Sequence, residues 1–260
     1  MTDFFVTSAG IVGSETTIRG FNAFRLRDPI CCRIRECMQY GKTLEEYAER
    51  LQKRNSGDYA CSWMFGDVGA PRIMRVELGL NYVNVETTRN GVFVGFNSTY
   101  DERIRNIECS GTSAIDTGTD GFRDISSSIG NRRVQLEKLA EKYRGKIDTE
   151  IVKRILADHY DNYLGKTVAN SRTICKHGYG PMSGPMSGSD GGGANPNKPV
   201  GAYDAKVADS ASIRRMSFFA HWGPPCGTPF SVHEHMKKHP DWNDWEDYFV
   251  YFPRRGWVEA

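Results

Sequence analysis

Four short β-rich runs follow one another between residues 59 and 97, and they constrain the fold more than any other part of the chain. The runs are YACSWMFGD, RIMRVELGL, YVNVETT and GVFVGFN. Length and composition of this kind are typical of strands. Asn90-Gly91, between the last two runs, favours a two-residue hairpin turn. The sequence therefore predicts an antiparallel meander.

A further pair of strands is expected before the meander. Residues 3–18 alternate small, β-branched and aromatic side chains, which predicts two buried strands with a turn near Gly10 to Gly13. A helix should follow, with Asp28 as its cap, Pro29 at its first position and Gly41 at its end.

The next helix has a clear beginning, because Thr43 and Glu46 have the spacing of a capping box. Apolar residues at helical spacing predict one buried face. These residues are Leu44, Tyr47, Ala48 and Leu51.

The second half of the chain mixes helices and strands. An amphipathic pattern predicts a helix over residues 129–143, and Asp148 should cap another helix that runs through Leu164. Residues 178–199 are rich in Gly, Pro and Ser and are expected to form a flexible surface loop. A strand over 216–222, a short helix over 231–238 and a β-like tail complete the pattern.

Composition excludes several classes of protein. The 260 residues can bury a large core, in one domain or two. A net charge of +2 gives no electrostatic case for binding nucleic acid. The apolar runs are too short for a transmembrane helix, and no secretory signal is visible. Seven cysteines without disulfide-framework spacing indicate reduced thiols and a cytoplasmic location.

Eight separated blocks resemble one family in the family's own order. They are DFFVTSAGIVGSETTI, RIRECMQYG, NSGDYACSWMFGD, FNSTYDERIRNIECSG, IDTEIVKRILADHYDNYL, SRTICKHG, GAYDAKVADS and HWGPPCGTPF. The chain is thereby similar to the phospholipase B-like proteins and the related penicillin-forming acyltransferases, which are N-terminal-nucleophile (Ntn) hydrolases. The resemblance implies one α+β domain over residues 1–260, incomplete at its N-terminus. Its fold would be an αββα sandwich of two antiparallel sheets between helices.

The resemblance also implies a chemistry. In this family an N-terminal cysteine attacks the carbonyl of an acyl amide or ester, and its own α-amine serves as the base. Here Met1 stands directly before the hairpin, and the expected cysteine-led strand is missing. We therefore expect little or no turnover by this chain alone.

Three explanations for the missing cysteine remain open. The chain is a downstream part of a precursor, or a separate protein that has lost the catalytic strand, or an enzyme with another nucleophile. Thr2 is the candidate for the third explanation, but the resemblance places it away from the site. The uncovered neighbouring strand would favour a homo-oligomer or pairing with the missing segment.

Four residues are candidates for a catalytic role by their match to family positions. A hydroxyl of Thr16 or Thr17 could bond the amine or the attacked carbonyl. Cys61 stands where the family has the asparagine expected to stabilise the oxyanion, and a thiol is a weak donor. Losing one such donor costs on the order of 3 kcal/mol of transition-state stabilisation. We favour Cys61 as a small buried hydrophobe, and Asn97 as a turn residue over a substrate-orienting one.

The resemblance also yields four candidates for substrate binding. Tyr59 and Trp63 flank the Cys61 position, and Arg103 and Arg105 could meet an acidic substrate group. For both arginines, solvated surface positions are the simpler expectation.

Two metal-binding patterns occur in the sequence, and neither is favoured. Asp158, His159 and Asp161 lie on an expected helix, where the resemblance suggests instead a structural network with SRTICKHG. Cys and His residues further along could form zinc half-sites, but no clean C-x2-C pair occurs and core packing is favoured. Those residues are Cys175, His177, His221, Cys226, His233, His235 and His239. We expect no cofactor and no metal.

The sequence thus predicts part of a phospholipase B-like hydrolase that acts on an acyl amide or acyl ester, either a small molecule or a lipid. The alternative is a non-catalytic binding or scaffold protein that recognises an acylated ligand or partner. No P-loop, dinucleotide fingerprint or G-x-S-x-G elbow points to another chemistry.

Overall fold

The computed structural model describes residues 3–109, 123–177, 202–238, 240 and 246–260, and it divides into two compact units. Unit 1 comprises Met1–Phe122 with Ser210–Ser217, and unit 2 comprises Arg123–Asp209 with Phe218–Ala260. Helices and antiparallel sheets confirm the α+β class. The αββα sandwich and the single domain stay predictions. Thr2, His239 and the loop 178–199 lie outside the described residues.

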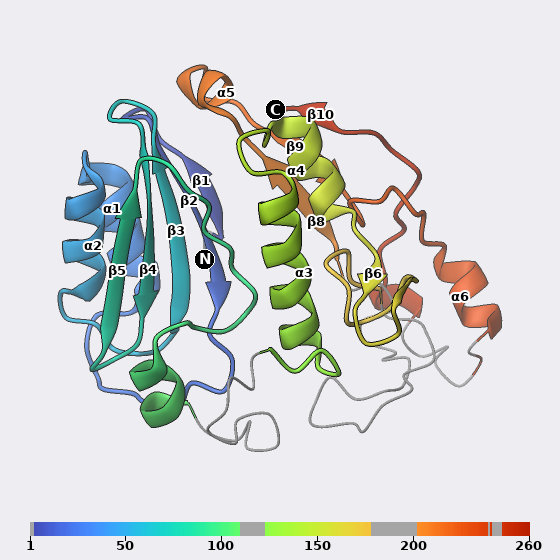
Figure 1. Cartoon of the computed structure of the whole chain (residues 1–260), viewed down its shortest axis with the longest axis horizontal. Coiled ribbons are helices and arrows are strands. Elements are labelled where there is room, and N and C mark those ends of the chain that lie inside the picture. The colour runs from blue at the N-terminus through green and yellow to red at the C-terminus, as the bar shows by residue number, and fades with distance from the viewer. Residues whose placement is uncertain (1–2, 110–122, 178–201, 239, 241–245) are drawn as a thin grey trace. The chain divides into compact units, whose positions relative to one another are not determined.

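Unit 1 is built on a five-stranded antiparallel sheet in the order β1-β2-β3-β4-β5 (Figure 1). The strands are β1 Phe4–Val6, β2 Ile11–Thr17, β3 Cys61–Asp67, β4 Arg72–Leu78 and β5 Val83–Thr88. The first turn lies earlier than expected, because Gly10 donates to the Thr7 carbonyl (3.0 Å) and has a φ of +79°. Gly13 belongs to β2, where a Cβ would stand 2.3 Å from the Phe5 ring.

Helices α1 (Ile30–Tyr40) and α2 (Leu44–Gln52) lie on one side of this sheet, which we call the helical face (Figure 1). Thr43 caps α2 as predicted, with a 3.2 Å bond from the Glu46 N–H to its hydroxyl, while the Glu46 carboxylate accepts from the Lys42 N–H at 2.9 Å rather than from Thr43. The four expected apolar residues of α2 are buried. They pack on side chains from the helical face of the sheet, among them Phe5, Ile11, Cys61, Trp63, Phe65, Met74, Val76 and Leu78.

The start of α1 differs from the expectation. Pro29 is the N-cap residue, and Asp28 does not cap the helix but pairs with Arg54. The first free N–H, that of Ile30, donates to the Asp58 carboxylate at 3.0 and 3.1 Å. A residue 28 positions away thus performs the capping, which local sequence patterns do not reveal.

The opposite side of the sheet, which we call the polar face, carries the alternate residues of the same strands. Ser14, Thr16, Ser62, Arg75 and Glu77 occupy it, as the strand period of two requires.

The prediction of a strand after Asn90-Gly91 is wrong, because residues 91–97 form a loop. Thr88 Oγ1 accepts a bond from the Asn90 N–H (3.1 Å), which makes a local turn rather than a hairpin. Further along, the N–H groups of Tyr100 and Asp101 donate to the fully buried Glu77 carboxylate at 2.6 and 2.8 Å. The carboxylate thus satisfies two backbone donors of the segment that follows the loop.

The remaining elements of unit 1 are a π-helix, η1 (Ile104–Glu108), and the short helix α5 (Ser210–Arg214). The Arg214 guanidinium donates to the Val68 carbonyl at 2.7 Å. This bond ties α5, which comes late in the sequence, to the turn between β3 and β4.

Unit 2 contains short strands and helices, several of them as expected. Its helices are α3 Ser128–Lys142, α4 Thr149–Leu156 and α6 Val232–Lys238. Its strands are β6 Tyr160–Asp161, β7 Lys166–Thr167, β8 Asp204–Val207, β9 Phe219–Trp222 and β10 Val258–Glu259. The last three form a sheet in the order β10-β9-β8. Asp148 caps α4 as predicted, with its carboxylate 2.7 Å from the Ile151 N–H.

Helix α4 ends eight residues before the predicted end at Leu164. In the segment that follows, side chains accept the backbone N–H groups that a longer helix would use: Asp158 Oδ1 accepts that of Tyr160 (3.0 Å), and Asp161 Oδ1 accepts those of Tyr163 (2.9 Å) and Leu164 (3.1 Å). Such bonds compete with helical ones.

Asp161 also organises the loop that follows β7. Its Oδ2 accepts from the Arg172 guanidinium at 2.7 and 2.9 Å and from the Asn170 amide at 2.6 Å. The Asp161 side chain is 0% exposed and that of Arg172 is 3% exposed. This buried pair is the structural network with SRTICKHG that the resemblance implied.

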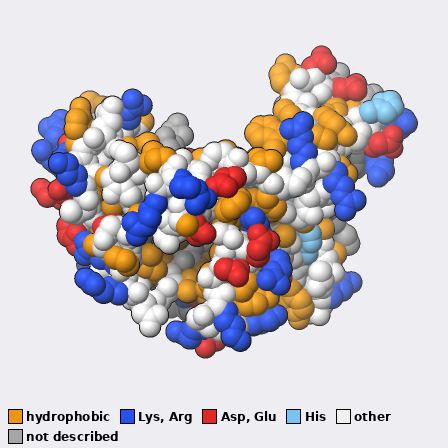
Figure 2. Space-filling model, turned by 90° about the horizontal axis from the view of Figure 1, so that it is seen from above, with side chains coloured by type: hydrophobic (Ala, Val, Ile, Leu, Met, Phe, Trp, Pro, Cys, Tyr) orange, Lys and Arg blue, Asp and Glu red, His pale blue; other side chains and the backbone are white. Residues whose placement is uncertain are grey.

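On the face drawn in Figure 2, Lys and Arg side chains are interspersed with Asp and Glu side chains. This mixture agrees with the net charge of +2. In the part of the chain that the structure describes, no helix has both the length and the apolarity to span a bilayer.

We predict that Asp161→Asn destabilises the protein by about 3–5 kcal/mol at pH 7, because it leaves the Arg172 charge buried without its partner. Burial opposes ionisation, but hydrogen bonds from Arg172 and Asn170 hold the pKa of Asp161 below its usual range. The stabilisation is therefore present above the unfolded-state pKa and is lost as pH falls through the folded one. Chemical denaturation at several pH values measures the difference.

The matched control is Glu141→Gln, because Glu141 pairs with Arg144 where both side chains are exposed. No measurable change is expected there. An equal loss in both variants, or an Asp161→Asn effect that does not shrink in acid, would contradict the assignment.

Candidate functional site

The register of β2 against β3 separates the two candidate threonines. Thr17 pairs with Cys61, and Thr16 pairs with Ser62. Because successive side chains of a strand point to opposite faces, Thr17 lies on the helical face and Thr16 on the polar face. The two hydroxyls therefore have different surroundings, although they are adjacent in sequence.

Thr17 belongs to a hydrogen-bonded group on the helical face. Its hydroxyl bonds the Tyr59 hydroxyl, which donates to Glu15 Oε1 at 3.0 Å. Burial raises the pKa of Tyr59 to about 12 and also raises the pKa of Glu15 above its usual value, against the opposing Tyr59 bond. Glu15 Oε2 is buried and has no hydrogen-bond partner among the described residues. Ionisation of Glu15 is therefore disfavoured in the folded protein.

Cys61 and Trp63 both lie in the core of the helical face. Each is 0% exposed, and the Trp63 indole stacks on the Phe65 ring with centroids 5.7 Å apart and an interplanar angle of 2°. The Cys61 thiol donates to the Tyr59 carbonyl at 3.4 Å. In the described structure these two side chains pack against protein, and their expected roles in catalysis and substrate binding stay predictions.

Asn97 has a φ of +63°, the left-handed conformation that asparagine tolerates better than most residues. Its amide donates to the Thr17 carbonyl at 3.4 Å, and its own carbonyl accepts from the Arg19 N–H at 3.3 Å. These bonds hold the end of the 91–97 loop against β2. The turn function considered from the sequence is thus visible, while the substrate-orienting function stays a prediction.

The polar face presents the Thr16 hydroxyl in a confined place. Thr16 Oγ1 is buried and has no hydrogen-bond partner among the described residues. The loop backbone approaches it at Gly95, where a Cβ would lie 2.7 Å from both Thr16 Cγ2 and Met64 Cε. A buried hydroxyl without a partner is uncommon and calls for a structural or functional reason.

The two candidate arginines near η1 differ from each other. Arg103 is exposed and binds the Asp101 carboxylate at 2.6 and 3.1 Å. Arg105 is only 6% exposed, which corrects the expectation of a solvated side chain, and its guanidinium lies 3.5 Å from Glu102. Neither guanidinium is placed at the Thr17 group by a described contact.

The buried thiols of unit 1 are poor nucleophiles. Burial raises the pKa of Cys37 to about 12 and raises that of Cys61 well above its usual value. Both thiols are therefore protonated at neutral pH, whereas the thiolate is the attacking form.

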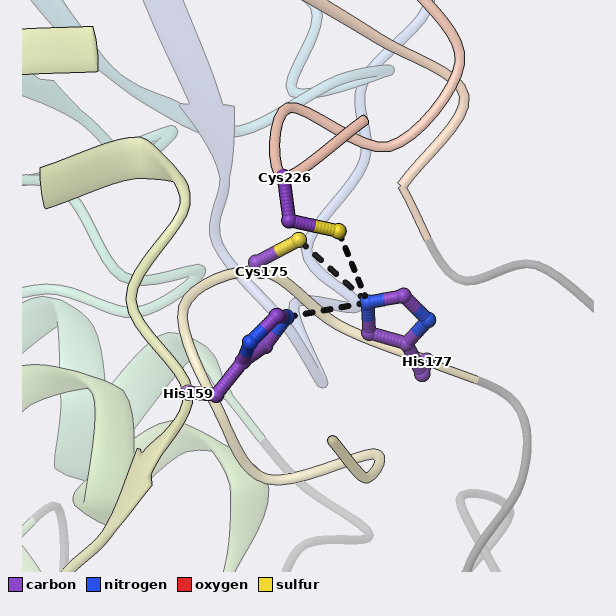
Figure 3. Close-up of side chains that lie close together, drawn as sticks. All are labelled: His159, Cys175, His177 and Cys226. Carbon is purple, nitrogen blue, oxygen red and sulfur yellow. Dashed lines mark hydrogen bonds between the residues drawn. The ribbon is translucent and has the colours of Figure 1, made fainter. Parts of the chain in front are cut away.

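A second group of reactive side chains gathers in unit 2 (Figure 3). His159, Cys175, His177 and Cys226 bring their nitrogen and sulfur atoms within 4.8 Å of one another. Hydrogen bonds from Cys175, His159 and His177 hold the pKa of the Cys226 thiol well below its usual range, although burial opposes this.

The sequence interpretation considered all four of these residues for metal binding but did not place His159 beside the other three. His159 belongs to one of the two metal patterns, with Asp158 and Asp161, and the resemblance links that block to SRTICKHG, which contains Cys175 and His177, only as a structural network. Two further histidines have different surroundings: His221 bonds the carbonyls of Gly223 and Arg255, and His235 packs against the Phe230 and Phe249 rings.

Comparison with known proteins supports a phospholipase B-like family. Phospholipase B of Crotalus adamanteus is 27% identical over 264 residues, which cover 91% of this chain and 44% of the relative. Phospholipase-B 81 of Drysdalia coronoides is 24% identical over 250 residues, which cover 86% and 40%. The chain thus spans less than half the length of these curated relatives. No family model matches the sequence.

We predict that Glu15→Gln becomes more stable relative to the native protein as pH rises from 4 to 7. The raised pKa of Glu15 means that its contribution to stability is fully present below the unfolded-state pKa and is lost as pH rises through the folded one. Glutamine stays neutral and avoids that loss. Thermal unfolding at each pH measures the difference in Tm.

Glu45→Gln is expected to show the opposite pH trend, because the hydrogen bond from Arg72 lowers the pKa of Glu45. Its Tm difference from the native protein should become more unfavourable as pH rises. Parallel trends for the two variants would show that the Glu15 environment is misassigned.

Proposed function

We propose that this chain forms part of a phospholipase B-like acyl hydrolase and that the acyl ester or amide of its substrate lies against the polar face of the β1–β5 sheet. The proposed reaction class, acyl hydrolysis, rests on the similarity to two phospholipases B over 86–91% of the chain. A lipid acyl ester is the substrate that the names of these relatives favour.

The Thr16 hydroxyl is the group on the polar face that we assign to the site. It is buried without a partner among the described residues, whereas Thr17 is engaged by Tyr59. A hydroxyl in this state can donate to the attacked carbonyl oxygen or accept from the attacking amine, the two functions that the family chemistry requires. Of the two threonines that the sequence offered for this role, Thr16 and Thr17, we therefore retain Thr16.

The helical-face group has a supporting function in this proposal. Tyr59 links Glu15 on β2 to Thr17 at the end of the same strand, and Asn97 fastens the following loop to the Thr17 carbonyl. These contacts fix the backbone that carries Thr16. They act on positioning, and they do not require direct contact between Tyr59 and substrate.

The buried thiols of unit 1 favour a second candidate, a non-catalytic protein that binds an acylated ligand. The thiols of Cys37 and Cys61 are held protonated, so neither thiol supplies the attacking sulfur of an acyl transfer. Recognition of an acyl chain by the same sheet face requires no nucleophile. The cytoplasmic location and the pairing of the sheet with another chain or segment remain proposals under both functions.

Fatty-acid release from phosphatidylcholine vesicles tests the proposal on the natural gene product that contains these residues. We expect hydrolysis, with Thr16→Val lowering kcat/KM about 10- to 100-fold through one lost hydrogen bond at the transition state. Thr17→Val is the matched control and should retain most activity, with its effect appearing in Tm. The result expected for the binding alternative is saturable binding of a lysophospholipid without turnover.

Two outcomes contradict the proposal. One is neither hydrolysis nor binding of any acyl ester or amide by a folded protein. The other is equal activity of the native protein and Thr16→Val, which would remove Thr16 from the site while leaving the reaction class intact.

A further inference from the structure

Four potential ligand atoms converge on one point in unit 2, and all belong to soft or borderline ligand types. His159 Nε2 and His177 Nε2 lie 3.0 Å apart, and the Sγ atoms of Cys175 and Cys226 each lie 3.4 Å from His177 Nε2 (Figure 3). All four atoms lie within 4.8 Å of one another. A tetrahedral ion with metal–ligand bonds of roughly 2.0–2.3 Å separates its ligands by about 3.3–3.8 Å. The observed spacing is close to that of such a shell.

The ligands come from three separate segments. His159 directly precedes β6, Cys175 and His177 lie in the loop after β7, and Cys226 lies in the turn after β9. Cys175 and His177 are buried, while His159 and Cys226 are partly exposed. An ion would therefore have a path of entry and would connect parts of unit 2 that are 67 positions apart in sequence, from 159 to 226.

The ligand positions are set by bonds that do not involve a metal. The Cys175 N–H donates to the Asp158 carbonyl at 3.0 Å, and the His177 N–H donates to the Asn170 carbonyl at 2.9 Å. The buried Asp161–Arg172 pair described above anchors the same loop. Preorganisation of this kind lowers the ordering cost of a metal site.

Hydrogen bonding alone accounts poorly for the arrangement. Two histidine nitrogens in contact need one donor and one acceptor, and both sulfur atoms also face the same His177 nitrogen. One nitrogen with one hydrogen or one lone pair cannot serve three partners at full strength. A disulfide between the two cysteines would leave the convergence of both imidazoles on that point unexplained.

We propose that His159, Cys175, His177 and Cys226 bind one Zn²⁺ ion as a tetrahedral Cys2His2 structural site. Two thiolates and two imidazoles suit zinc, whereas Mg²⁺ and Ca²⁺ prefer oxygen ligands. Four protein ligands fill the tetrahedral shell, so the ion has no open position for water or substrate and serves to hold the three segments together. This site is independent of the proposed hydrolase function.

Metal analysis of the intact protein tests the proposal directly. Protein purified without chelator, or reloaded with ZnCl2, is expected to retain about one zinc per chain after dialysis. Cys226→Ser and His159→Ala should weaken zinc binding on the order of a hundredfold or more, measured by competition with a chromophoric chelator. Removal of zinc with a chelator should lower the Tm of the native protein and leave that of Cys226→Ser unchanged.

Matched controls separate the site from adventitious binding. Cys31→Ser and His233→Ala change an exposed cysteine and an exposed histidine outside the cluster and should keep the native zinc content. His159→Cys replaces one ligand by another and should retain zinc, even if His159→Ala fails to fold. With Co²⁺ in place of zinc, His159→Cys should show stronger sulfur-to-metal charge-transfer absorption than the native protein.

Three results would overturn the proposal. The first is a folded native protein that retains no zinc after reloading. The second is a Cys175–Cys226 disulfide in non-reducing peptide maps of protein kept under reducing conditions before analysis. The third is an equal loss of zinc in Cys31→Ser and Cys226→Ser, which would indicate binding to surface thiols.

Discussion

The pairing of β2 with β3 is the constraint on which the rest of unit 1 depends. A register of Thr17 opposite Cys61 assigns every neighbouring side chain to one of two faces. A shift by one residue would move Trp63 and Phe65 out of the core and bring Ser62 and Met64 into it. The apolar packing against α1 and α2 therefore fixes the register. The register in turn places Thr16 on the side of the sheet that those helices do not cover.

Sequence patterns predicted the elements whose signals are local. The capping residues Thr43 and Asp148 begin their helices as expected, because their side chains bond N–H groups three positions away. The buried stripe of α2 follows from helical periodicity, and strands β3, β4 and β5 follow from the length and composition of their β-rich runs. The strand predicted after Asn90-Gly91 does not form: Thr88 Oγ1 accepts from the Asn90 N–H in a local turn, and residues 91–97 form a loop.

The candidate site residues were harder to place, because their environments depend on distant contacts. The resemblance selected Thr16 and Thr17 together, and only the sheet register distinguishes them. From the sequence, zinc is not favoured because no clean C-x2-C pair occurs and because Cys175 and Cys226 match family blocks, which favours core packing. His159 enters only a separate pattern with Asp158 and Asp161. Helix α4 ends at Leu156 rather than at Leu164, and the segment after it brings His159 beside His177. No periodicity in the sequence encodes this effect.

The central claim is that the two faces of the unit 1 sheet have different functions: the helical face supports the fold and the polar face receives the acyl group. Photoaffinity labelling with a phospholipid that carries a diazirine in its acyl chain, followed by peptide mapping, tests this claim most directly. The account predicts labels on β2, β3 and the 91–97 loop that excess unlabelled phospholipid displaces. Displaceable labels confined to α1 and α2, or labels that phospholipid does not displace, would contradict it.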